Sequence, residues 1–152
     1  MSVGRTLHKQ AANLEKNVQT PNKIGYLCLD IRNNMPVLEK IVISDFRNIQ
    51  LQELVFSPNV NCISGNNGEG KTNLLDAIYY LSMTKSAFAS SDKFNFRHGT
   101  EEFSIAGNYR MENGLSSRFA LKMTTKGEKK VRRDDKPYPK VSSHVGVLPI
   151  VM

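Results

Sequence analysis

Eight consecutive residues have the types and spacing of a phosphate-binding loop. They fit the pattern G-x-x-x-x-G-K-[ST] and are Gly65, Asn66, Asn67, Gly68, Glu69, Gly70, Lys71 and Thr72. Glycines in such a loop let the backbone approach an anion closely, and its N–H groups then surround the phosphates. Lys71 would reach the β- and γ-phosphates, and the Thr72 hydroxyl would ligate Mg²⁺. The pattern therefore predicts a binding site for a nucleoside triphosphate and its magnesium ion.

The segments on either side of the loop fit the same interpretation. Val60 to Ser64 is predicted to form a short buried strand that leads into the loop, and Lys71 to Met83 a helix that leads out of it. The helix is expected to place four apolar residues along one face: Leu74, Leu75, Ile78 and Leu81. Its N-terminus would present unpaired N–H groups and a partial positive charge to the anion. The alternative, a glycine-rich turn before an ordinary helix, is weaker because strand, loop and helix all fall where the motif needs them.

Composition and charge point to an anionic partner. The chain has 152 residues, 39% of them hydrophobic, which suits one domain with a real core. Its net charge of +7 favours a nucleotide, a nucleic acid or an acidic membrane as the partner. Basic residues are dense between 118 and 140, and six are candidate contacts to DNA phosphates: Lys122, Lys126, Lys129, Lys130, Arg132 and Arg133. The alternative is a solvated hairpin whose charges only maintain solubility.

Other kinds of site find little support in the sequence. Cys28 and Cys62 lie far apart without the spacing of zinc ligands, which indicates reduced thiols and a cytoplasmic protein. The three histidines form no metal-ligand pattern. No stretch is long enough to span a membrane. Of the anionic partners that the charge allows, we expect ATP and DNA and no membrane.

The chain divides into an extension and a fold. Residues 1–34 are rich in Asn, Gln and Lys and are expected to be a mobile N-terminal extension, with the fold over 35–152. Met35, at the junction, is a candidate for the natural initiator. Strands are expected over Val37–Ser44, with Ile41 and Ile43 on one face, and over Leu51–Phe56.

The rest of the fold is expected to consist of the loop region and a β-meander. The loop's own strand and helix occupy 59–84, and a polar, irregular stretch follows over 85–98. The meander covers 102–133, and its strands are Glu102–Met111, Ser116–Thr124 and Glu128–Arg133. An Asn-Gly pair at 113–114 marks the first hairpin turn.

Several stretches together match a known family. Leu38 to Ile49 contains Asp45-Phe46-Arg47-Asn48 and is followed by the phosphate-binding loop and then by Asn73 to Tyr79. Shorter matches are Phe96-Arg97-His98 and Gly146-Val147-Leu148-Pro149. Over 35–152 these residues resemble the RecF family of bacterial DNA replication and repair proteins. The resemblance implies an α/β fold: the N-terminal half of a P-loop NTPase head of the ABC or SMC type, with an antiparallel β-meander subdomain and an incomplete sheet.

The resemblance also implies a function. In this class two subunits sandwich two ATP molecules as an ATP-dependent homodimer, which clamps single-stranded DNA or single–double-strand junctions. RecO and RecR would be its partners in recombination repair, with a link to SOS induction, and the intact protein would be a weak DNA-dependent ATPase. Arg47 would lie near the bound ATP, where it could neutralise phosphate charge or stack on adenine. The alternative for Arg47 is a surface turn residue.

The sequence departs from the family in ways that bear on catalysis. Family members are more than twice as long. Neither the strand carrying the magnesium-binding aspartate and catalytic glutamate nor the signature sequence follows the loop. Every glutamine precedes the loop, and Tyr26 to Asp30 imitates the aspartate strand only within the extension. We therefore expect an N-terminal fragment that binds ATP weakly, has no catalytic residue of its own and does not hydrolyse ATP.

Two other classes remain open. One is another P-loop enzyme, such as a GTPase, a small-molecule kinase or a different SMC-like head. A GTPase would need a guanine-reading Asn-Lys-x-Asp stretch, which this chain lacks. The other is a basic nucleic-acid-binding module in which the phosphate loop is vestigial, and its DNA affinity would survive the loss of Lys71.

Overall fold

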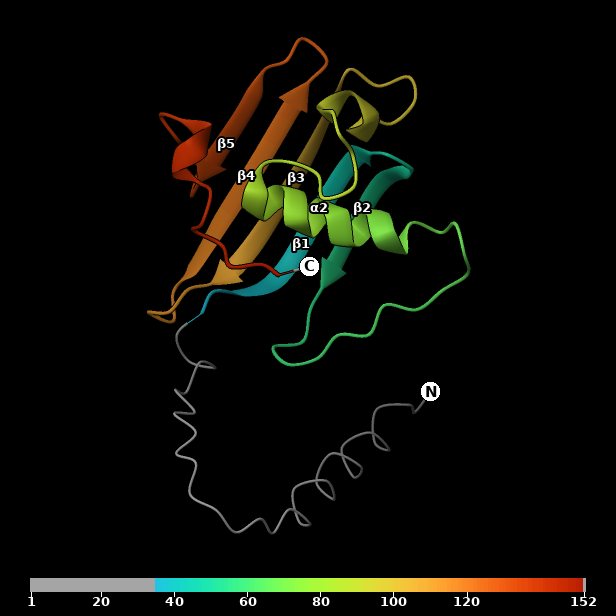
Figure 1. Cartoon of the computed structure of the whole chain (residues 1–152). Helices are drawn as coiled ribbons and strands as arrows, with labels where there is room; N and C mark the ends of the chain where they lie inside the picture. Colours follow the sequence, from blue (N-terminus) through green and yellow to red (C-terminus); the bar gives the residue numbers. More distant parts are fainter. Residues whose placement is uncertain (1–34, 152) are drawn as a thin grey trace, which may run out of the picture.

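The computed structural model describes residues 35–151. The expected extension, residues 1–34, lies outside this part, together with Cys28 and the Tyr26–Asp30 segment. Within residues 35–151, six strands form one antiparallel sheet, and one α-helix lies across a face of that sheet (Figure 1). No helix in this range is long and apolar enough to cross a membrane.

The sheet has the strand order β2-β1-β3-β4-β5-β6, and each neighbouring pair is antiparallel. Its strands are β1 (Val37–Phe46), β2 (Ile49–Val55), β3 (Glu102–Arg110), β4 (Ser116–Thr124), β5 (Lys129–Arg133) and β6 (Lys136–Pro137). The helices are α2 (Lys71–Met83) and two 3₁₀ helices, η2 (Asp92–Asn95) and η3 (Val141–Ser143). Strands β3, β4 and β5 form the expected meander, whereas the short β6 was not foreseen from the sequence.

The core lies between α2 and the sheet face that it covers. Residues alternate along the strands, so that one face of the sheet is apolar. Its fully buried side chains include Ile41, Ile43, Phe46, Phe103, Ile105, Phe119 and Leu121. From α2, the residues packed against them are Leu74, Ala77, Tyr80 and Leu81. The prediction that Ile41 and Ile43 lie on the same face of the strand is confirmed.

Aromatic rings form the centre of this core. Phe103 lies edge-on to Phe46, Tyr80 and Phe96, with ring centroids 5.2, 5.4 and 5.1 Å away. The Tyr80 hydroxyl donates a hydrogen bond to Asp92 Oδ1 at 2.7 Å. Burial, and then this bond, raise the pKa of Tyr80 well above its ordinary value. The ring cluster therefore joins the helix to the sheet and to η2.

The helix has the predicted bounds, but one predicted core residue is wrong. Leu75 is 44% exposed, because the buried stripe runs through Leu74, Ala77 and Leu81. Leu75 is one residue from Leu74, and a step of one residue turns an α-helix by about 100°. Ile78 is only partly buried at the edge of the stripe.

The buried strand predicted before the phosphate loop is absent from the structure. Residues 60–64 have no regular secondary structure and are exposed, and Cys62 is a free, exposed cysteine rather than a core residue. Val60 is 86% exposed. A buried strand needs neighbours on both edges, and none of the six described strands pairs with this segment. In Figure 1 it runs as a wide loop from the end of β2 to the start of α2.

The C-terminal segment of the described residues holds the last turn of α2 in place through hydrogen bonds. It begins at η3 and crosses back over the sheet towards α2 (Figure 1). The Ser82 hydroxyl donates to the Leu148 carbonyl at 2.5 Å, and His144 Nε2 lies 2.6 Å from the Leu81 carbonyl, to which it donates. Leu148 and His144 are both buried. The last turn of α2 is therefore held by residues more than sixty positions away in sequence.

Candidate functional site

The phosphate loop ends in backbone conformations that glycine adopts without strain. Gly68 and Gly70 have φ angles of 87° and 97°, in the left-handed region. Gly70 is also the N-cap of α2, and a Cβ at this position would lie 2.9 Å from Asn48 Oδ1. Glycine at position 70 therefore serves both the turn into the helix and a close approach to the β1–β2 turn.

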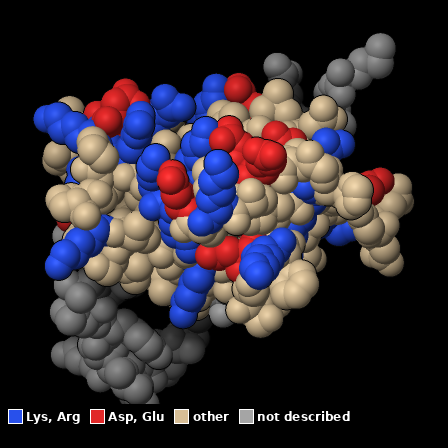
Figure 2. Space-filling model, turned by 90° about the horizontal axis from the view of Figure 1, so that it is seen from above, with Lys and Arg blue, Asp and Glu red and all other residues tan. Residues whose placement is uncertain are grey.

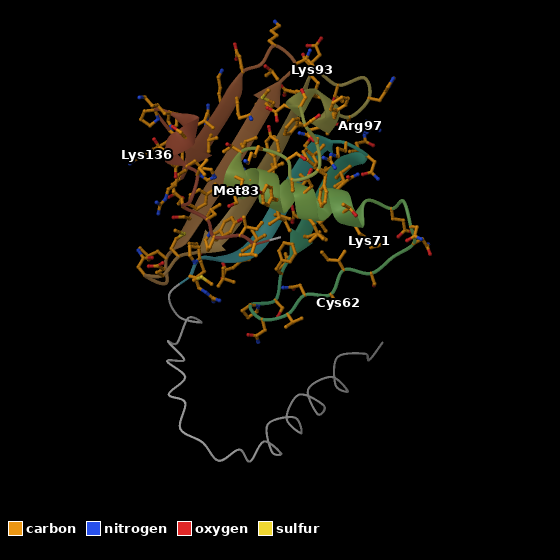
Figure 3. The ribbon with its side chains drawn as sticks, in the orientation of Figure 1. Cys62, Lys71, Met83, Lys93, Arg97 and Lys136 are labelled. Atoms are coloured by element: carbon orange, nitrogen blue, oxygen red, sulfur yellow. The ribbon has the colours of Figure 1, made fainter. Side chains whose placement is uncertain are left out.

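The Lys71 side chain curls back over the loop. Its Nζ donates to the carbonyls of Gly65 and Asn66, each at 2.7 Å. Figure 3 shows Lys71 at the start of α2, while Cys62 lies on the long preceding segment. Thr72, the next residue, is exposed. A hollow of about 290 Å³ lies against this turn and is lined by Asn67, Gly68, Gly70, Lys71, Thr72 and Asn73. The predicted lysine and threonine thus face one cavity at a helix N-terminus.

Arg47 is the centre of a polar cluster beside the loop. It occupies the two-residue turn between β1 and β2, with φ at 53°, and its side chain is 16% exposed. Its guanidinium pairs with the carboxylate of Asp76 on α2 at 2.5 Å. It also donates to Asn73 Oδ1 at 2.9 Å, Ser86 Oγ at 3.0 Å and Asn95 Oδ1 at 3.1 Å. Arg47 is therefore not a free surface residue: it joins the turn, the helix and the loop after the helix.

Asp76 is completely buried and fully engaged. Besides the ion pair, it accepts hydrogen bonds from the Ser86 hydroxyl at 2.7 Å and from the Ala87 N–H at 2.8 Å. Buried carboxylates require such partners because desolvation of an isolated charge is costly. The sequence analysis did not identify Asp76 as a site residue. Its only signal in the sequence is an acidic residue on the buried side of the helix, next to Ala77.

A short hydrogen-bonded chain connects this cluster to the phosphate loop. Asn73, which accepts from Arg47, donates through Nδ2 to Asn48 Oδ1 at 2.7 Å. Asn48 Nδ2 in turn lies 3.4 Å from the Gly68 carbonyl. The β1–β2 turn therefore contacts the loop directly through Asn48 and indirectly through Asn73.

The six basic residues predicted to contact DNA do not share one surface. Lys122, Lys130 and Arg132 project from the sheet face opposite α2, since their neighbours Leu121 and Val131 point into the core. Lys126 lies in the exposed turn between β4 and β5.

The other two candidates lie on the helix side. Lys129 Nζ donates to the Thr84 carbonyl at 2.7 Å and pairs with Asp92 at 2.8 Å. Arg133 lies 5.3 Å from the centre of the Phe119 ring and 3.7 Å from an Asp134 oxygen. Both therefore already have intramolecular partners.

The face opposite α2 contains a basic hollow that includes a residue missed by the sequence analysis. Its volume is about 360 Å³, Ser104, Ala106 and Ala120 contribute to it, and its cations are Arg118, Lys122, Lys130 and Arg132. Lys122 and Lys130 stand directly opposite each other across the β4–β5 pair. Like charges in that position repel, although Glu102 and Glu128 pair with them at 2.7 and 3.1 Å. Arg118 could have been found by counting in twos along β4 from Lys122.

The side of the molecule that is uppermost in Figure 1 carries both signs of charge. Figure 2 shows lysines and arginines interleaved with aspartates and glutamates there, without a uniformly basic face. Any anion-binding surface on this side is therefore local. The cation-rimmed hollow on the face opposite α2, lined by Arg118, Lys122, Lys130 and Arg132, is a separate feature.

Comparison with known proteins places the chain in a family context. A family model described as an AAA domain matches residues 40–144. The DNA replication and repair protein RecF of Phocaeicola vulgatus is 42% identical over 116 residues, which is 76% of this chain and 31% of that protein. RecF of Porphyromonas gingivalis is 40% identical over 116 residues, or 76% of this chain and 32% of that protein. The chain thus spans about a third of the length of these relatives.

Solved structures show the same fold. The recombination mediator protein RecF in its ATP complex matches with a TM-score of 0.70 and 28% identity, covering 74% of this chain and 31% of that one. A solved SMC ATPase matches with a TM-score of 0.66, covering 73% of this chain and 76% of that one; at 19% identity it shows the fold alone. The predicted P-loop head fold and the resemblance noted in the sequence are confirmed.

Proposed function

Because this chain belongs to the AAA domain family and its relatives there are RecF proteins, we propose that it binds ATP through Gly65 to Thr72 as part of a DNA repair and replication protein. The observation that carries the proposal is the placement of Lys71 and Thr72 on one hollow at the N-terminus of α2. Backbone N–H groups and the helix dipole favour an anion at that position.

The residues present fit a magnesium nucleotide. Lys71 Nζ must leave the carbonyls of Gly65 and Asn66 to reach the phosphates, and both of those contacts are exposed and easily exchanged. The Thr72 hydroxyl is exposed and free to face a cation. When bound, Mg²⁺ neutralises phosphate charge. Arg47, which donates to Asn73 Oδ1 on the first turn of α2 at 2.9 Å, is proposed to stabilise the nucleotide side of α2.

We expect this chain to bind ATP without turning it over. Hydrolysis needs a group that orients or deprotonates the attacking water. The carboxylate buried nearest the loop, Asp76, is occupied by Arg47, Ser86 and Ala87 and so is not available as a base. Measurable ATPase activity of the purified 152-residue chain that disappears in Lys71→Met would contradict this expectation.

Titration with a fluorescent ATP analogue in the presence of Mg²⁺ tests the binding proposal. Lys71→Ala is expected to weaken binding at least tenfold, since it removes the cation on the phosphates. The matched control is Lys93→Ala, which removes an exposed lysine on η2, away from Lys71 (Figure 3). Equal affinity of Lys71→Ala and the wild type would refute the site, and a preference for GTP would favour the GTPase alternative.

For DNA, we propose that the cation-rimmed hollow on the face opposite α2 contacts phosphates. The support is geometric: four cations surround an alanine-floored hollow, and two of them, Arg118 and Arg132, have no carboxylate ion-pair partner among residues 35–151. Lys129 and Arg133 are excluded from this surface because they lie on the helix side. Binding through phosphates would be insensitive to base sequence and would weaken steeply with salt.

Two charge-reversal pairs test this surface with the same change in net charge. Lys130→Glu/Arg132→Glu is expected to lower affinity for single-stranded DNA and to reduce the salt slope by about one to two. Lys136→Glu/Lys140→Glu is the control, because Lys136 stands opposite Arg133 in the β5–β6 strand pair, on the helix side of the sheet. Equal loss in both pairs would show a general charge effect instead. DNA affinity that survives Lys71→Ala and ignores ATP would favour the basic module with a vestigial loop.

The remaining family features are proposals for the whole protein. We infer an ATP-dependent homodimer that binds single-stranded DNA or its junctions in the cytoplasm and acts with RecO and RecR in recombination repair and SOS induction. The support is the matching structure of RecF with ATP, a recombination mediator protein in the RecFOR pathway. Light scattering with and without ATP, on a chain of the relatives' length, tests the dimer directly.

A further inference from the structure

The Glu69 side chain folds back onto the first half of the phosphate loop. Its Oε2 accepts a hydrogen bond from the Asn66 backbone N–H at 2.8 Å, and its Oε1 accepts one from Asn66 Nδ2 at 2.8 Å. A Cβ added to Gly65 would lie 2.3 Å from Glu69 Oε2, so the carboxylate fits only because residue 65 is glycine. The carboxylate is thus seated within the curve of the loop.

This contact places an anion where the loop is built to hold one. Loops of this pattern bind phosphates through their backbone N–H groups, and here one such group is bonded to the protein's own carboxylate. Lys71 Nζ contacts the carbonyl of the same residue, Asn66, and also the carbonyl of Gly65. The lysine charge that would attract a phosphate is therefore offset locally by Glu69.

We propose that Glu69 sets the affinity and the charge preference of the loop, acting as an internal anion that competes with the incoming phosphates. The proposal rests on the proposed nucleotide site. The negative charge of Glu69 repels a metal-free triphosphate more strongly than a magnesium-bound one, because Mg²⁺ cancels two of the nucleotide's negative charges. Glu69 thereby selects the magnesium complex over free ATP.

Two substitutions separate the charge of Glu69 from its contacts. Glu69→Gln keeps the size of the side chain and an oxygen for the Asn66 N–H, but removes the charge. Glu69→Asp keeps the charge and shortens the side chain by one methylene. The control is Glu53→Gln, which removes a carboxylate from β2 that pairs with Lys40 on the opposite side of the sheet from α2.

The measurement is the Kd of ATP, once with excess Mg²⁺ and once in EDTA. We expect Glu69→Gln to tighten magnesium ATP by about threefold and metal-free ATP by about tenfold, as expected for a screened charge a few ångströms from the phosphates. The ratio of the Kd measured in EDTA to the Kd measured with Mg²⁺ is therefore expected to be lower in Glu69→Gln than in the wild type. Glu69→Asp and Glu53→Gln are expected to bind no more tightly than the wild type.

The possible outcomes separate this inference from the proposed site. If the wild type binds ATP in a Lys71-dependent way and Glu69→Gln binds it no more tightly, the inference is overturned but the proposed nucleotide site stands. Glu69 is then a residue that orders the loop. Weaker binding by Glu69→Gln has the same meaning. Lys71-dependent binding that is measurable only in Glu69→Gln supports the inference, and an absence of binding in both proteins overturns the inference together with the site.

Discussion

The ion pair between Arg47 and Asp76 gives the sharpest test of how the nucleotide side of the fold is held together. Asp76→Asn preserves the shape of the side chain but removes its charge, leaving the Arg47 guanidinium without a counter-ion. Asp76 is completely buried, and the Arg47 side chain is 16% exposed. The substituted amide also has one oxygen to offer, where the carboxylate used two for Ser86 and Ala87.

The expected cost follows from these contacts. Removing one partner of a buried pair costs about 3–5 kcal/mol, and the partial exposure of Arg47 places this case at the lower end, about 3 kcal/mol. With a urea dependence of about 2 kcal/mol per molar, the unfolding midpoint should fall by about 1.5 M. Arg47→Met should cost more, because it leaves the carboxylate alone in the core.

The assay is urea unfolding followed by circular dichroism, with Asp135→Asn as the control. Asp135 is exposed in the β5–β6 turn at a φ of 64°, which Asn tolerates, so its change should stay within about 0.5 kcal/mol. The double variant Arg47→Met/Asp76→Asn should lose much less than the sum of the single variants. A loss below 1 kcal/mol for Asp76→Asn, or simple additivity in the double variant, would refute the reasoning.

Two further predictions concern the core and its pH dependence. Phe103→Ala should cost about 4 kcal/mol of unfolding free energy, because the ring is fully buried among three others, whereas Phe94→Ala, at a 68% exposed position, should cost little; equal losses in urea unfolding would contradict this core. Burial lowers the pKa of His144, although its hydrogen bond to the Leu81 carbonyl opposes the shift. The unfolded chain therefore protonates first, so this stability is complete above about pH 6.5 and is lost as the pH falls below it. Unfolding midpoints at pH 7.5 and 5.5 should differ more in the wild type than in His144→Gln, and an equal difference would exclude the role of His144.

Elements defined by local patterns could be predicted from the sequence. The helix over Lys71–Met83 follows a left-handed glycine at its N-cap and ends at Thr84, which is also left-handed. The strand Ser116–Thr124 alternates between the faces of the sheet over its whole length. The residues of the phosphate loop could be predicted equally well, because their pattern lies within eight consecutive positions.

Features that depend on partners distant in sequence could not be predicted. Val60 to Ser64 has the apolar content of a buried strand, but burial requires neighbouring strands, and none pairs with it among residues 35–151. The Arg47–Asp76 pair depends on how a turn and a helix meet across 29 positions. The basic residues lie on two faces because side chains alternate along β4 and β5, whereas the direct opposition of Lys122 and Lys130 depends on the register of these strands, which composition does not reveal.

The fastening of α2 at its last turn determines how the helix can move. Ser82 and Leu81 are bonded to the C-terminal segment, whereas the first turn follows the exposed loop and its Asn73 contacts the β1–β2 turn through Arg47 and Asn48. A displacement at Lys71 is therefore a rotation about the fixed end. A helix of 13 residues is about 20 Å long, so a shift of about 2 Å at its start tilts it by about 6°. Because Asp76 lies midway, roughly half of that shift would reach Arg47 and the β1–β2 turn, so that the helix acts as a lever between the phosphate loop and the edge of the sheet.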